Sequence, residues 1–305
     1  MIFVPTVVKR ALRRLRGQPT GTVRVFEANS VSRSIVALLD DPAYELIPGT
    51  AATQAIAALP PGSLVTVTCS PRGRIPATLE LSAELAAAGH RVVPHLAARL
   101  VDNEILTEVV AALARHAIAD VFVIAGDAPD PLGEYDGTLA LLPDLLAAAP
   151  HLERVGIAGY PDGHPLLDAT ELRQQLLAKQ ELLADAGVAG WVSTQMCFDP
   201  PRIRTWLEQE RAAGLTLPVR LGVPGVVDRA RLLRIGARLG VGASLRFASK
   251  QGGTIAKLVA PGGYDPLNVI DSLAPDAERL GIERLHVFTF NSVSETVAWR
   301  DAVLR

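Results

Sequence analysis

Runs of apolar residues alternate along most of the chain with amphipathic stretches, and most of the apolar runs end in a polar residue. The run Val121–Ala125 is representative, because five apolar residues are followed by Gly126 and Asp127. An unbroken run of this kind is typical of a strand that is covered on both faces, as in a parallel sheet. In parallel α/β folds the groups that do chemistry collect where the strands end. Asp127 is therefore the first candidate for a functional residue.

Eight strands are expected from this pattern, with helices between them. The strands are predicted at Val23–Asn29, Leu64–Ser70, Arg91–Ala97, Asp120–Gly126, Arg154–Tyr160, Trp191–Phe198, Pro218–Val223 and Arg284–Asn291. Each connection is long enough for a right-handed crossover, and the alternation predicts a closed (β/α)8 TIM barrel. The alternative is a doubly wound sheet, which usually has a glycine-rich phosphate-binding turn after its first strand. Here the first predicted strand ends in Glu27, Ala28, Asn29 and Ser30 instead.

Helix boundaries between the strands are also readable. Asp102 precedes an apolar stripe, and Asp199 is followed by Pro200, so both acids are expected to cap helices. Gly89, Gly187 and Gly214 are expected to end helices. The connections at 30–63 and 224–283 are longer than the others.

The N-terminal residues differ from the rest of the chain. Val4–Arg16 predicts a short basic helix, which we interpret as a solvated helix rather than a membrane-surface helix. We therefore divide the chain into residues 1–21, a basic helix and linker, and residues 22–305, a single catalytic barrel domain.

Composition narrows the possible partners. The formal net charge of −2 offers no electrostatic footprint for nucleic acid. No apolar run reaches the ~18 residues of a membrane span, and the N-terminus lacks the uninterrupted apolar core of a secretory signal. The two cysteines, Cys69 and Cys197, form neither a disulfide framework nor a zinc spacing. We expect a cytoplasmic protein that binds small molecules, with no nucleic-acid or membrane partner and an oligomeric state that the sequence does not specify.

The predicted strand ends carry a polar set that would meet at one rim of the barrel. Its members are Glu27, Thr68, His95, Asp127, Tyr160, Gln195 and Asn291, with His164 in the loop that follows Tyr160. Any one of them could cap a turn or lie satisfied in the core, but two acids, an imidazole, a phenol and an amide at one rim indicate an active site.

Two kinds of chemistry fit this rim poorly. The ligand set for zinc or iron is thin, so no metal is expected. No G-x-S-x-G motif is present, and Ser70 and Cys197 have no histidine at a motif spacing. The carboxylates of Glu27 and Asp127 remain as the best candidates for catalytic groups. Burial would raise the pKa of Glu27 and let it donate a proton, while ionised Asp127 would hold a cationic group.

The segments RVFEAN, VTVTCS, VVPHLAA, VFVIAGDAP, GIAGYPDGHP, DAGVAGWVSTQMCFD, LPVRLGVPG and HVFTFN together resemble the methylenetetrahydrofolate reductase family. The resemblance spans about residues 22–292 in the family's order. Its most specific parts are the YPxxHP loop, the TQxxFD segment and the HxxTxN ending of the last strand. It implies a (β/α)8 barrel that transfers hydride from a reduced nicotinamide, usually through bound FAD, to the methylene carbon of 5,10-methylenetetrahydrofolate.

The resemblance also implies roles for individual residues. Glu27 matches the general acid that protonates the departing nitrogen, and Asp127 matches the carboxylate beside the pterin. Gln195 matches the amide that reads the pterin ring. The positions that contact FAD in the family are matched by Thr68, His95, Tyr160 and His164.

Two positions depart from the family's flavin pattern. Ala125 stands where an arginine is common, and Leu183 stands where a lysine is usual, with Lys179 one turn earlier. Losing that arginine removes a charged, multidentate contact to the flavin. We therefore predict a flavin-free reductase in which NADH or NADPH passes its hydride directly to the folate. The alternatives are an FAD-dependent reductase of the same or a related pterin, and a barrel that binds folate without catalysis.

Overall fold

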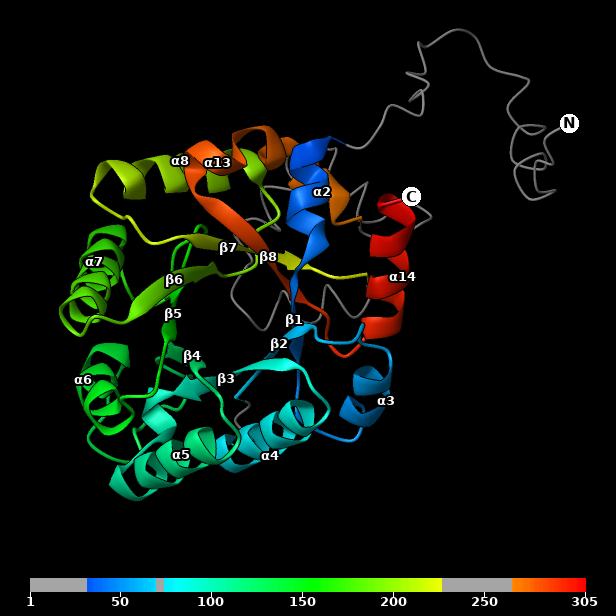
Figure 1. The fold of residues 1–305 in the computed structure, drawn as a ribbon. Coiled ribbons are helices and arrows are strands. Elements are labelled where there is room, and N and C mark those ends of the chain that lie inside the picture. The colour runs from blue at the N-terminus through cyan, green and yellow to red at the C-terminus, as the bar shows by residue number, and fades with distance from the viewer. Residues whose placement is uncertain (1–31, 70–73, 227–264) are drawn as a thin grey trace, which may run out of the picture. The chain divides into compact units, whose positions relative to one another are not determined.

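The computed structural model describes residues 32–69, 74–226 and 265–305 (Figure 1). In chain order the elements are α2 Arg33–Asp40, β1 Ala43–Leu46, α3 Ala52–Ala57, β2 Leu64–Val67, α4 Arg74–Ala87, β3 Arg91–Ala97, η1 Ala98–Leu100, α5 Asn103–Arg115, β4 Asp120–Ile124, α6 Thr138–Ala148, β5 Arg154–Gly159, α7 Ala169–Asp185, β6 Ala189–Thr194, α8 Pro200–Ala212, β7 Val219–Pro224, α12 Leu267–Leu273, η2 Ala274–Asp276, α13 Ala277–Leu280, β8 Ile282–Phe288 and α14 Val293–Val303.

The strands form a closed parallel barrel in the order of the sequence, from β1 to β8. β8 pairs with both β7 and β1, which completes the ring. Figure 1 shows the helices arranged around this ring of strands. The expected (β/α)8 barrel is confirmed, and all the predicted strands except the first match a barrel strand to within a few residues.

The prediction of the first strand is wrong. The place between β2 and β8 is taken by Ala43–Leu46, which pairs in parallel with both neighbours. This segment lies inside the long connection expected at 30–63, where α2, β1 and α3 now stand. All four residues of β1 are buried, so the short run AYEL behaves as a barrel strand despite its length and its acid. Val23–Asn29, Glu27 and the predicted basic helix lie outside the described residues.

Side chains that follow β8 hold β1 in place. The Oγ1 hydroxyl of Thr289 donates to the backbone oxygen of Glu45 at 2.5 Å. The Asn291 amide bonds both backbone groups of Ile47, accepting from its nitrogen at 2.8 Å and donating to its oxygen at 2.9 Å. Asn291 has φ 63°, in the left-handed region that asparagine tolerates better than most residues. We call these contacts of Thr289 and Asn291 the β8–β1 clasp.

Large rings fill part of the barrel interior. A core cluster joins Ala43, Leu64, Val93, Phe122 and Trp191, one residue from each of five strands. The guanidinium carbon of Arg220 lies 3.7 Å from the centroid of a Trp191 ring, a favourable cation–π contact. A Cβ atom at Gly156 would come within 2.4 Å of the Trp191 ring. The glycine therefore makes room for the indole.

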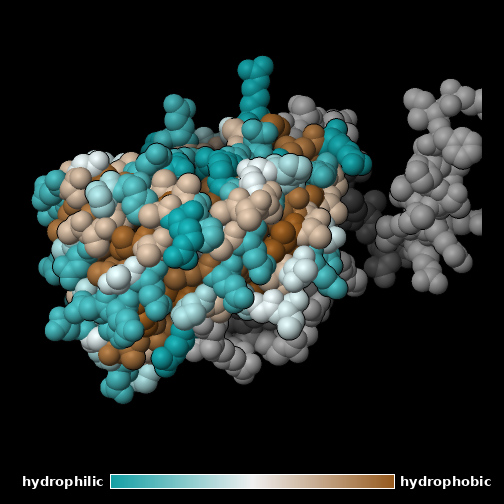
Figure 2. Space-filling view, turned by 60° about the horizontal axis from the view of Figure 1, so that its bottom comes forward, coloured by the Kyte–Doolittle hydropathy of each residue, from teal (hydrophilic) through white to brown (hydrophobic). Residues whose placement is uncertain are grey.

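The helix signals in the sequence are largely confirmed. Asp102 caps α5 by accepting from the nitrogen of Ile105 at 2.8 Å, and Asp199 caps α8. Gly89, Gly187 and Gly214 have positive φ where helices end. Figure 2 shows hydrophilic side chains spread over one face of the molecule between smaller hydrophobic areas, as expected for amphipathic outer helices. Among the described residues, no helix combines the length and apolar character needed to cross a membrane.

Candidate active site

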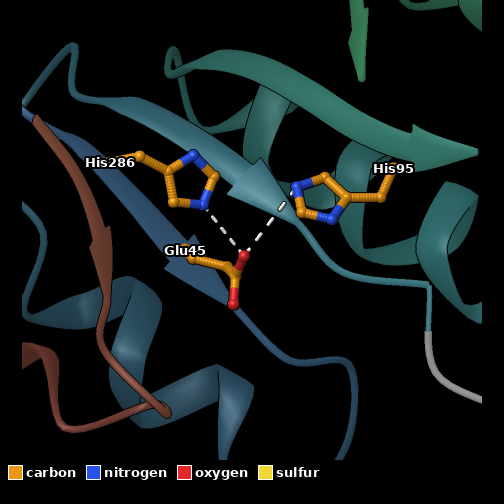
Figure 3. A group of neighbouring side chains, drawn as sticks. All are labelled: Glu45, His95 and His286. Atoms are coloured by element: carbon orange, nitrogen blue, oxygen red, sulfur yellow. Dashed lines mark hydrogen bonds and ion pairs between the residues drawn. The ribbon is translucent and has the colours of Figure 1, made fainter. Parts of the chain in front are cut away.

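Three strands bring an acid and two imidazoles together inside the barrel. Glu45 on β1, His95 on β3 and His286 on β8 form what we call the Glu–His group (Figure 3). His286 Nε2 lies 2.9 Å from Glu45 Oε2. His95 Nε2 lies 4.0 Å from the same oxygen. The exposed fractions of the three residues are only 7%, 4% and 2% respectively, so the group is removed from bulk water.

Aromatic rings surround the two imidazoles. The centroids of His95 and Phe122 are 4.7 Å apart in an edge-on arrangement, and those of His286 and Phe288 are 4.9 Å apart. Burial, together with the nearby His286, holds the pKa of His95 well below its usual value, because the apolar surroundings disfavour its charged form.

The Glu–His group contains the donor types of a metal site. Its three ligand-type atoms lie within 4.8 Å of one another, and two histidines with one carboxylate could in principle hold a transition metal. In the structure Glu45 Oε2 and His286 Nε2 are joined directly by their hydrogen bond. We interpret the group as an acid that is hydrogen-bonded to an imidazole.

A second polar set lies where β4 and β5 end. The ring centroids of Tyr160 and His164 are 5.2 Å apart in an edge-on contact. Burial raises the pKa of Tyr160, and the Asp127 carboxylate raises it further. Burial lowers the pKa of His164, while Asp127 opposes that effect. The structure thus brings Asp127, Tyr160 and His164 together at the rim, as the sequence predicts, with the Asp127 side chain exposed.

Gln195 and Thr68 occupy strand ends that belong to the same rim. Gln195 is half-buried directly after β6, and its side-chain oxygen accepts from the nitrogen of Met196 at 2.8 Å. Thr68 follows β2, where its carbonyl oxygen accepts from the Thr78 hydroxyl at 3.0 Å.

Burial raises the pKa of the Cys197 thiol, which argues against a nucleophilic thiolate there.

Two members of the Glu–His group were missed by the sequence analysis, namely Glu45 and His286. The predicted acid, Glu27, lies outside the described residues. Phe26–Glu27 and Tyr44–Glu45 are both aromatic–acid pairs with apolar residues beside them. The unusual length of the 30–63 connection was a signal for the second pair, because long loops without structure are uncommon in compact domains.

Both positions that depart from the flavin pattern lie in the described part of the chain. Leu183 is 1% exposed within α7, and a Cβ atom at Gly190 would lie 2.9 Å from its side chain. Lys179 is also buried, and burial lowers its pKa to about 8. Ala125 offers no charge. The side chain of Arg99 donates to the carbonyl oxygens of Ala128, Pro129 and Asp136, so its guanidinium is already occupied. At these two positions the chain lacks the charged side chains that the family resemblance would lead us to expect beside a flavin.

A closed parallel barrel with a buried acid–imidazole pair and a polar rim at its strand ends defines a (β/α)8 barrel of the enzyme type. The family model described as methylenetetrahydrofolate reductase matches residues 52–240. This is more than half of the chain, and the protein belongs to that family.

One curated relative is methylenetetrahydrofolate reductase 2 of Saccharomyces cerevisiae, which is 36% identical over 81 residues. The match covers 26% of this chain and only 13% of the yeast protein. Among solved structures, an uncharacterized protein from Clostridium thermocellum that binds two copies of 5-methyl-5,6,7,8-tetrahydrofolic acid has a TM-score of 0.58 at 12% identity. That match covers 87% of this chain and 93% of the other, and it supports the fold. A tryptophan synthase structure from M. tuberculosis has a TM-score of 0.48 at 14% identity, covering 90% of this chain and 99% of the other.

Proposed function

We propose that the protein reduces 5,10-methylenetetrahydrofolate to 5-methyltetrahydrofolate with NADH or NADPH, without flavin. Family membership gives the reaction class. The observation that carries the proposal is Glu45, a buried acid near the carboxyl end of β1 that is hydrogen-bonded to His286. Active sites of (β/α)8 barrels lie at this end of the strands.

The chemistry requires a proton before a hydride. The methylene carbon bridges two nitrogens and accepts a hydride only after one carbon–nitrogen bond opens, and opening places a proton on the departing nitrogen. We assign this proton to Glu45, in the place that the sequence analysis gave to Glu27.

Opening of the ring leaves an iminium cation at the carbon that will accept the hydride. Asp127 carries a carboxylate at the rim and suits the stabilisation of that cation. Gln195 suits recognition of the pterin, because its side-chain oxygen is held by the nitrogen of Met196 and its amide nitrogen can donate to a ligand. These two roles follow the family resemblance and are part of the proposal.

Hydride transfer then needs a nicotinamide close to the iminium carbon. We place the nicotinamide near Tyr160 and His164, the positions that match flavin contacts in the family. The overall reaction consumes one hydride and one proton, and it yields the oxidised nucleotide and the 5-methyl folate. The protein contributes position and charge, while the hydride comes from the nucleotide.

The test is anaerobic oxidation of NADH and of NADPH by the purified full-length chain with methylenetetrahydrofolate, with and without added FAD. We expect one nucleotide to be oxidised for each 5-methyltetrahydrofolate formed, at a rate that FAD does not change. Turnover only with stoichiometric FAD would establish the flavin-dependent alternative. Folate binding without nucleotide oxidation under any condition would establish a non-catalytic barrel.

A further inference from the structure

The carboxylate of Glu45 has two oxygens in different surroundings. Both imidazoles of the Glu–His group converge on Oε2, while the other oxygen points away from both rings (Figure 3). The two oxygens are therefore distinguishable within the protein. Any role of the histidines in catalysis would act through Oε2, which leaves Oε1 as the oxygen available to a ligand.

The surroundings of His286 indicate which ring nitrogen donates. Its Nδ1 atom is buried and has no hydrogen-bond partner among the described residues. The rings of Phe288 and Phe122 lie beside His286, with centroids 4.9 Å and 6.1 Å from its own. A hydrogen on Nδ1 would therefore be a buried donor without an acceptor, which is costly. On Nε2 the hydrogen has an acceptor, Glu45 Oε2 at 2.9 Å.

His95 does not replace this donor. Its Nε2 atom is buried without a hydrogen-bond partner in the described part of the chain, and it stays 4.0 Å from Glu45 Oε2. That separation is too long for a hydrogen bond. The carboxyl orientation in the structure therefore depends on His286.

We propose that His286 is a positioning residue: its Nε2–H donates to Glu45 Oε2 and so keeps the acidic proton on Oε1, facing the substrate. The inference rests on the proposed function. In the reaction the proton moves from Oε1 to the departing nitrogen, the carbon–nitrogen bond breaks, and the carboxylate keeps its hydrogen bond to His286. A proton from water then restores the acid.

The test compares two substitutions in the full-length protein. His286→Gln keeps an N–H donor at a similar reach but cannot titrate, whereas His286→Leu keeps the bulk and removes the donor. A hydrogen bond to a charged group is worth about 1.5–3 kcal/mol, so His286→Leu should lower kcat by roughly 10- to 150-fold. KM for folate and nucleotide should change by less than about 3-fold, because the substitution weakens proton transfer in the transition state and leaves substrate binding intact. His286→Gln should restore most of kcat.

Several outcomes would overturn the inference. An active wild type with an equally active His286→Leu variant would remove the role of His286 and leave the proposed function intact, whereas an inactive wild type would refute the proposed function itself. An equal loss of kcat in His286→Leu and His286→Gln would show that donation of a hydrogen bond to Glu45 is not what His286 contributes. Stoichiometric zinc or iron in the purified protein, with activity lost on chelation, would replace the hydrogen bond by a metal centre.

A spectroscopic measurement on the wild-type protein tests the same hydrogen bond without any substitution. Nitrogen-15 NMR of the histidine-labelled wild-type protein should show a hydrogen on Nε2 of His286. An Nε2 atom without hydrogen, with the hydrogen on Nδ1 instead, would contradict the inference.

Discussion

At the scale of single residues, the environment of each ionisable group decides what it can do. Glu45 and Glu27 both follow an aromatic residue in a short apolar run, so local pattern does not separate them. What distinguishes Glu45 is its register in the barrel, opposite Thr66 on β2 and Phe288 on β8. The pairing with Phe288 joins residues more than two hundred positions apart in the chain, which periodicity does not encode. His95, Asp127, Tyr160 and His164 were predicted from the sequence because each lies in or shortly after a clearly apolar strand.

Lys179 gives a prediction at the residue scale. Its amine is buried in α7, and burial lowers its pKa from 10.5 to about 8. The unfolded chain therefore binds more protons than the folded protein between about pH 8 and 10.5, and the contribution of Lys179 to stability rises with pH in that window. The contribution is fully present above 10.5 and is lost as the pH falls through about 8.

Lys179→Met removes this titration. The free energy of unfolding of the wild type should rise relative to that of the variant by about 3 kcal/mol across the window, since one pKa unit corresponds to about 1.4 kcal/mol. Urea unfolding of both proteins at several pH values measures the difference. A difference that is flat from pH 8 to 10.5 would show that the amine is not buried as the structure has it. Lys179→Arg is the control, because arginine keeps its charge throughout this range.

At the scale of elements, β1 depends on its neighbours more than on its own sequence. Four residues make a short strand, and the β8–β1 clasp of Thr289 and Asn291 bonds backbone groups of Glu45 and Ile47. The sequence predicted the last strand to end at Asn291, so the position of Thr289 and Asn291 at that strand end was readable. Their hydrogen bonds to β1 were not, because the backbone group that a side chain meets depends on how the barrel closes.

Asn291→Ala should loosen the clasp. It removes both bonds to Ile47 and places alanine at φ 63°. We expect a loss of about 1–3 kcal/mol in the free energy of unfolding from the bonds and roughly 1–2 kcal/mol more from the left-handed backbone. Because Glu45 lies in the strand that the clasp holds, kcat should fall as well.

Asn291→Gly is the matched variant, because glycine adopts this φ without steric cost. It should lose the hydrogen-bond part of the stability and not the steric part. Chemical denaturation of the three proteins separates the two contributions. Wild-type stability in Asn291→Ala would mean that the clasp does not hold β1.

At the scale of the whole molecule, the barrel could be predicted from the sequence, but the position of its first strand could not. Strongly apolar strands such as Asp120–Ile124 and Arg91–Ala97 carry an unambiguous pattern, and their order requires a barrel. The first strand was misplaced because a barrel needs eight strands and the sequence offers two candidates for one place. The departures at Ala125 and Leu183 from the family's flavin pattern were readable directly from the sequence, and the absence of flavin stays a prediction.

The most direct measurement is the flavin-free turnover number of Glu45→Gln compared with that of Glu27→Gln. A general acid contributes roughly 10²- to 10⁴-fold, so Glu45→Gln should lower kcat by about that factor while binding 5-methyltetrahydrofolate normally, and Glu27→Gln should turn over at nearly the wild-type rate. A Glu45→Gln enzyme as active as the wild type, or a loss found in Glu27→Gln instead, would contradict the assignment of Glu45 as the proton donor.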